Sequence, residues 1–238
     1  MKKIIFSGIG GEITDPIVLN KPSMFFNVIY IAEAEDFLKL RTLLPYTTRI
    51  RNNRLYIYYE LNYFIEMLYE GSPDAFNILT TKYEDKQFVG LEYEMIEKKL
   101  NDFISIKLVD NLLKKSDEYN LGTFGVGIID EKNEKKVVKN FGYSNKNAYL
   151  CIRELMLAEQ ILKKGIYDKS KIDIFTLNRI YNFKYKKEEI KEIRKKLIDS
   201  VNFLKEKSVI NYEPDLEFVN DLILSIRNVE IIDKNVEL

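Results

Sequence analysis

Several acidic side chains stand beside predicted strands, where grouped carboxylates could hold a divalent metal. Hard cations such as magnesium need several carboxylate oxygens that converge within a few ångströms. Two interpretations stay open: a metal-binding patch, or residues that charge helix starts and solvated turns. The second is favoured, because the N-terminus of a helix attracts acidic side chains. The residues concerned are Glu12, Asp15, Glu33, Glu35, Asp36 and Glu60.

The strand predicted over Met24–Ile31 offers no carboxylate pair to such a metal. Side chains two residues apart on a strand point to the same face. The pairs with this spacing at its start are Met24 with Phe26 and Ser23 with Phe25, which do not bind divalent metals. We therefore predict no catalytic residue and no metal ligand here. Glu60 is the best single candidate for a catalytic acid, and the competing interpretation is that it begins a helix.

Glycines near the N-terminus are candidate phosphate contacts. The predicted turn Ser7–Gly11 contains Gly8, Gly10 and Gly11, whose missing side chains permit close backbone approach to a ligand. The alternative is a plain tight turn, because no Lys-Ser or Lys-Thr pair follows as in a P-loop.

Cations on one predicted helix are further candidates for phosphate binding. Lys146 and Arg153 are seven residues apart and so share a helix face, where they could meet triphosphate or nucleic-acid phosphate. The alternative is a solvated Lys146, with Arg153 paired to a carboxylate such as Glu154 or Glu159. Phe183–Lys187 interleaves lysines with aromatic residues, but two glutamates follow at once and favour a solvated helix start.

The composition excludes several classes of site. The 238 residues include no His and a single cysteine, which excludes His-based hydrolysis, His-containing metal sites and thiolate clusters. Lys plus Arg and Asp plus Glu number 37 each, so the net charge steers the protein toward neither nucleic acid nor membrane. Cys151 lies in an apolar run and is predicted to be a buried, inert thiol. No segment approaches the roughly 18 apolar residues of a membrane span, so we expect no membrane partner and a cytoplasmic location.

The hydrophobic period changes near Leu61, from strand-like before it to helical after it. We predict an α+β fold: a small mixed sheet with helices, followed by a helical C-terminal half. The sequence suggests one division, an α/β domain over 1–100 and a helical domain packed on it over 101–238. The predicted strands are Lys3–Phe6, Met24–Ile31 and Arg54–Tyr59, the last preceded by a basic turn over Arg49–Arg54. The predicted helices are Leu61–Tyr69, one that starts at Asp74, Phe103–Lys115, Asn147–Lys163, Glu188–Lys207 and one from Pro214 through Ile226.

Five phrases in this order resemble the DNA polymerase β-type nucleotidyltransferases associated with RNA repair and RNA ligase operons, a family common in phages and bacteria. The phrases span nearly the whole chain, and within Lys146–Arg153 Tyr149 stands where that family usually has His. They are Tyr59–Leu68, Gly71–Leu79, Phe103–Lys107, Lys146–Arg153, and Glu206–Ser208 followed by Glu213–Asp215.

The resemblance implies transfer of a nucleoside monophosphate from an NTP to a hydroxyl. In the family this depends on a Gly-Ser turn, an Asp-x-Asp strand and a third carboxylate on a later strand, which together hold two magnesium ions. This sequence departs at all three points, with Ile9 in place of the serine, Met24 and Phe26 in place of the aspartates, and Leu55 or Arg54 in place of the third carboxylate.

Three hypotheses about function follow. The leading one is a nucleotidyltransferase-fold pseudoenzyme without a cofactor that binds a nucleotide, an RNA end or a protein partner. The second is an active nucleotidyltransferase with relocated carboxylates, which would need magnesium and would act on a nucleic-acid or protein hydroxyl. The third is a structural or assembly subunit, in a protein of phage origin.

Overall fold

The computed structural model describes residues 3–9, 25–33, 46–52, 54–124 and 138–236, with side chains described as far as residue 228 in the last helix. The chain divides into two compact units. We call Met1–Phe103 with Glu213–Leu238 the sheet unit, and Ile104–Tyr212 the helical unit. The first change of unit lies close to the predicted division at residue 100. The return of the last helix to the sheet unit was not predicted.

Five strands of the described residues form one mixed sheet in the order β3-β4-β2-β1-β5. β2 runs parallel to β4, whereas β1 is antiparallel to β2 and β5, and β3 is antiparallel to β4. β2 is the central strand and is buried from Phe26 to Ile31, as its unbroken apolar run predicts. The strands are β1 (Lys3–Ile9), β2 (Phe25–Ile31), β3 (Tyr46–Arg51), β4 (Arg54–Glu60) and β5 (Lys86–Val89).

β1 is longer than predicted, and this corrects the interpretation of Gly8. Instead of opening a turn, Gly8 lies inside the strand, opposite Asn27 of β2 and Lys86 of β5. A Cβ at Gly8 would lie 2.7 Å from the ring of Phe6 and 3.2 Å from the carbonyl oxygen of Asp85. Glycine at this position therefore serves packing of the sheet. Gly10 and Gly11 lie outside the described residues.

The predicted basic turn over Arg49–Arg54 is instead the end of a hairpin. β3 continues to Arg51, which is paired in register with Arg54 at the start of β4. Asn52, between them, has a φ of 50°, a left-handed conformation that Asn tolerates better than most residues. The hairpin thus includes an edge strand, β3, that was not predicted.

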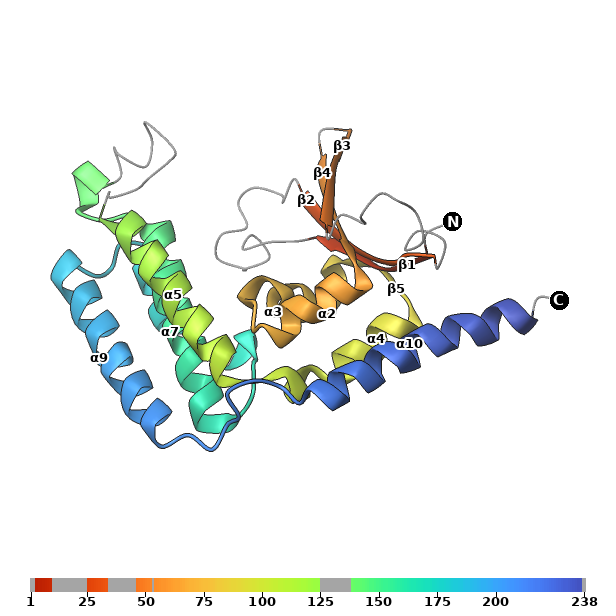
Figure 1. The fold of residues 1–238 in the computed structure, drawn as a ribbon. Coiled ribbons are helices and arrows are strands. Elements are labelled where there is room, and N and C mark those ends of the chain that lie inside the picture. Colours follow the sequence, from red (N-terminus) through yellow and green to blue (C-terminus); the bar gives the residue numbers. More distant parts are fainter. Residues whose placement is uncertain (1–2, 10–24, 34–45, 53, 125–137, 237–238) are drawn as a thin grey trace. The chain divides into compact units, whose positions relative to one another are not determined.

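Helices of the sheet unit follow β4 and β5, and α10 packs on α2 and α4 (Figure 1). Leu61, Phe64, Ile65 and Leu68 of α2 are buried on one stripe, as the helical period predicts. In α10, Val219, Leu222 and Ile226 are buried, and Phe218 meets Phe103 edge-on. The helices are α2 (Leu61–Tyr69), α3 (Pro73–Leu79), η2 (Tyr83–Asp85), α4 (Leu91–Lys98), η3 (Leu100–Phe103) and α10 (Leu216–Val236).

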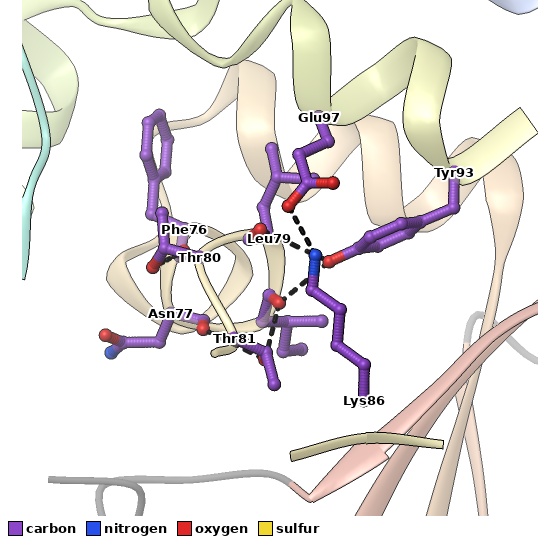
Figure 2. Close-up of polar contacts among 9 residues, drawn as sticks. Phe76, Asn77, Leu79, Thr80, Thr81, Lys86, Tyr93 and Glu97 are labelled. Atoms are coloured by element: carbon purple, nitrogen blue, oxygen red, sulfur yellow. Dashed lines mark hydrogen bonds and ion pairs between the residues drawn. The ribbon is translucent and has the colours of Figure 1, made fainter. Parts of the chain in front are cut away.

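A partly buried polar cluster lies at the C-terminal end of α3 (Figure 2). The hydroxyl of Tyr93 lies 3.0 Å from the carbonyl oxygen of Ile78 and 3.2 Å from that of Leu79, so it donates to the last turn of the helix. Lys86 Nζ pairs with Glu97 at 2.6 Å beside it. Burial, with the negative charge of Glu97, raises the pKa of Tyr93. The cluster supplies donors to carbonyl groups that a helix end leaves without partners.

The helical unit is organised around α7, which packs against α5, α8 and α9. This confirms the prediction that Asn147–Lys163 forms the buried centre of the second half. Cys151 is buried, as predicted, and burial raises the pKa of its thiol. Across the described residues we find no helix with the length and apolarity to cross a membrane. The helices are α5 (Ile106–Thr123), α7 (Asn145–Lys164), η4 (Lys169–Lys171), α8 (Ile174–Tyr181) and α9 (Lys187–Glu206).

Candidate functional site

The start of β2 is the place where the resemblance requires metal-binding carboxylates. Phe25 is paired with Leu55 of the parallel strand β4, and Phe26 with Tyr56. The rings of Phe26 and Tyr56 stack with their centroids 5.1 Å apart, and the guanidinium of Arg54 lies 5.4 Å above the Phe26 ring. These groups do not fit magnesium, which takes oxygen ligands.

The structure describes no alternative ligand set. Among the described residues, no group of three or more His, Cys, Asp or Glu side chains could hold a metal ion. Glu33, just after β2, is half-buried. The other acidic candidates and one motif position lie outside the described residues: Glu12, Asp15, Met24, Glu35 and Asp36.

Glu60 has the geometry of a helix cap. Its carboxylate accepts a hydrogen bond from the backbone N–H of Asn62 at 2.7 Å, so it caps α2. The same carboxylate pairs with Arg227 of α10 at 3.2 Å. It is 4% exposed, and the backbone N–H of Ala32 lies 3.5 Å from it. These contacts support the interpretation of Glu60 as a helix-entry residue.

The two cations predicted to share a helix face on α7 have different environments. Lys146 is exposed, and its phosphate binding stays a prediction. Arg153 is 2% exposed and forms an ion pair with Glu154, which is 0% exposed. The pair is the alternative that the sequence left open. A phosphate that bound Arg153 would have to reach a buried guanidinium that is already paired with Glu154.

In the basic and aromatic stretch Phe183–Lys187, the two aromatic side chains contact other residues of the helical unit, whereas Lys184 and Lys186 are exposed. The ring of Phe183 stacks on Phe141 at 4.0 Å, and the guanidinium of Arg179 lies 4.6 Å above the ring of Tyr185. The backbone N–H of Lys186 donates to Glu189 at the start of α9. The contact agrees with the helix-start interpretation.

The sequence interpretation missed a group of basic and aromatic residues on β3, β4 and the adjacent strand β2. We call Phe26, Arg49, Arg51, Arg54, Tyr56 and Tyr58 the arginine face. The signal was present, because arginines and tyrosines recur at every second position on both sides of Asn52. That alternation places them on one face of two paired strands. Because Arg49–Arg54 was interpreted as a turn, the sequence analysis did not predict this face.

The comparisons with known proteins give little. No family model and no curated protein matches the sequence. Among solved structures, the chain is similar to a nucleotidyltransferase-like protein from Exiguobacterium sibiricum 255-15, with 11% identity, 87% of this chain and 69% of that chain covered, and a TM-score of 0.32. A TM-score of this size does not show a common fold.

Proposed function

We propose that the protein is a pseudoenzyme of the nucleotidyltransferase type, which binds a nucleotide, a nucleic acid or a protein partner and transfers no nucleotide. The observation that supports the proposal most directly is the pairing of Phe25 with Leu55 and of Phe26 with Tyr56. An enzyme that used two magnesium ions would need carboxylates at such positions. Association with RNA repair and phage origin rest on the sequence resemblance alone.

The competing proposal of an active enzyme needs carboxylates from elsewhere. Glu60 is engaged by a helix N-terminus and by Arg227, so using it as a metal ligand would break both contacts. Of the remaining acidic candidates, Glu12 and Asp15 precede β2 in the sequence, and Glu33, Glu35 and Asp36 follow it. A one-residue slip of β2 could not supply them, because it would turn the apolar side chains of the strand out of the core.

A thermal-shift series with each NTP, with and without magnesium, tests the proposal. A ligand that binds only the folded protein raises the melting temperature. We expect stabilisation by at least one NTP without magnesium. Stabilisation that requires magnesium would contradict the pseudoenzyme proposal and favour the enzyme. No stabilisation by any NTP would contradict nucleotide binding and favour the structural subunit.

A further inference from the structure

The arginine face is formed by three adjacent strands. Arg51 is paired with Arg54, Arg49 with Tyr56, and Phe26 with Tyr56 across β2 and β4. Residues paired in register point to the same face of a sheet, and so do residues two apart on one strand. The opposite face of the same strands carries Tyr46, whose ring stacks on Tyr63 of α2 at 6.1 Å. The arginines therefore lie on the face turned away from α2, on a hairpin that extends from the sheet edge (Figure 1).

The rings of the arginine face form a row. Phe26 stacks on Tyr56 at 5.1 Å, and Tyr56 and Tyr58 follow with centroids 6.4 Å apart. Guanidinium groups lie over two of the rings, with Arg54 5.4 Å from the centre of Phe26 and Arg49 5.9 Å from that of Tyr58. Tyr56 and Tyr58 are half-buried.

The charge of this face is not neutralised within the described part of the chain. Arg49, Arg51 and Arg54 are all exposed, and no described carboxylate forms an ion pair with them. The segment Tyr46–Tyr59 contains no acidic residue. Glu60, at the end of β4, is paired with Arg227. Among the described residues, these three arginines thus form a local positive patch on a chain of zero net charge.

We propose that the arginine face binds single-stranded nucleic acid, with arginines on phosphates and bases stacked on the tyrosine rings. This inference rests on the binding role proposed above and specifies its ligand. Guanidinium groups pair with phosphate through two hydrogen bonds, and aromatic rings stack on any base. Every nucleotide of a single strand supplies both features, because its base is free to stack, whereas a carboxylate side chain supplies only the charge. Binding should tolerate changes of base sequence.

The test uses the full chain and a fluorescein-labelled single-stranded oligonucleotide of mixed sequence, measured by fluorescence anisotropy. We expect the triple variant Arg49→Gln, Arg51→Gln and Arg54→Gln to bind about tenfold more weakly or worse. The negative slope of log affinity against log salt should become shallower by about 2, since each phosphate contact to a single strand contributes about −0.7. The matched control replaces three exposed lysines outside the hairpin, Lys82, Lys164 and Lys195, with Gln and should bind like the parent protein.

The variant Tyr58→Leu tests stacking separately from charge. We expect about fivefold weaker binding of the oligonucleotide, because loss of one stacked ring costs at least this much. Polyglutamate of equal charge should displace the oligonucleotide poorly. Circular dichroism and the melting temperature of each variant verify folding. Because the arginines are exposed, replacing them should leave both measurements unchanged.

Several outcomes would overturn the proposal. It is wrong if the parent protein binds no oligonucleotide, or if the triple variant binds as the parent does. Displacement by polyglutamate, with no effect of Tyr58→Leu, would assign the face to an acidic protein. Equal affinity for duplex would refute recognition of single strands. Stabilisation by NTP with no oligonucleotide binding would refute this inference alone, and nucleotide transfer would refute the pseudoenzyme proposal alone.

Discussion

Phe26 shows how one side chain limits the chemistry of a strand position. Its ring is 3% exposed, stacks on Tyr56 and lies beneath Arg54, so the position contributes to the core and to an aromatic row. A carboxylate there could hold magnesium, but a phenyl ring offers no oxygen ligand. Glu60 and Arg153, the other candidates taken from the sequence, make contacts that predict losses of stability when they are replaced.

Replacing Glu60 with Ala should lower the free energy of unfolding by about 1–2 kcal/mol, because α2 loses its cap and Arg227 loses its carboxylate. Urea unfolding followed by circular dichroism measures this. Glu66→Ala, at an exposed site on the same helix, is the control and should change little. An unchanged stability for Glu60→Ala would contradict the capping role.

Replacing Arg153 with Ala should destabilise the protein by about 3–5 kcal/mol, because it leaves the carboxylate of Glu154 buried without its cation. The double variant Arg153→Leu with Glu154→Leu should be less destabilised than the single one, since it removes both charges. Urea unfolding of the two variants gives the comparison. A single variant as stable as the parent that bound nucleotide more weakly would instead support phosphate binding by Arg153.

At the scale of elements, the sequence predicts what a long apolar pattern can specify. The runs at Met24–Ile31 and Asn147–Lys163 correspond to β2 and α7. Both elements bury almost every described apolar side chain, and this burial produces the apolar pattern in the sequence. β3 was missed because an edge strand has no such run and its Thr and Arg residues are mostly exposed. β5, with four residues, is too short to show a period.

Prediction of the site was limited in a similar way, because the sequence pattern specifies residue types but not tertiary contacts. The sequence excludes carboxylates at Met24, Phe26 and Leu55 by residue type alone, and no knowledge of the fold is needed for that. Whether Arg153 faces a ligand or the core depends on which face of α7 packs on α5 and α9, and spacing within one helix does not determine this. The arginine face needs the pairing of β3 with β4, which is a tertiary property.

The cap of α8 gives a prediction about pH. Asp173 accepts hydrogen bonds from the side chain and backbone N–H of Thr176, and these lower its pKa. A carboxyl whose pKa is lower in the folded state stabilises the protein above its unfolded value of about 3.9, and this contribution is lost as the pH falls through the folded value.

The variant Asp173→Asn keeps a capping oxygen but does not titrate. Its stability relative to the parent protein should therefore rise as the pH falls below about 4. Thermal melts from neutral to acidic pH measure the difference. Asp199→Asn, at an exposed position on α9, is the control. A difference between parent and Asp173→Asn that stayed constant over this range would contradict the role of the charge.

At the scale of the whole molecule, a chain without net charge forms a mixed sheet in one compact unit and a helical bundle in another. The chain leaves the sheet unit at Phe103 and re-enters it at Glu213, so α10 belongs to the sheet unit. There Arg227 pairs with Glu60 and Phe218 contacts Phe103. The two crossings lie outside the strands that the resemblance would use for catalysis. The central proposal concerns those strands, because their side chains at the family's metal-binding positions are apolar.

The most direct test is a transfer assay with purified protein, each labelled NTP, magnesium or manganese, and RNA or protein acceptors. We predict no labelled product above a blank without protein, because the side chains of Phe25, Phe26 and Leu55 supply no oxygen ligand for a metal. Transfer that disappears when Glu60, or the group Glu33, Glu35 and Asp36, is replaced would contradict the account and establish an active enzyme with relocated carboxylates.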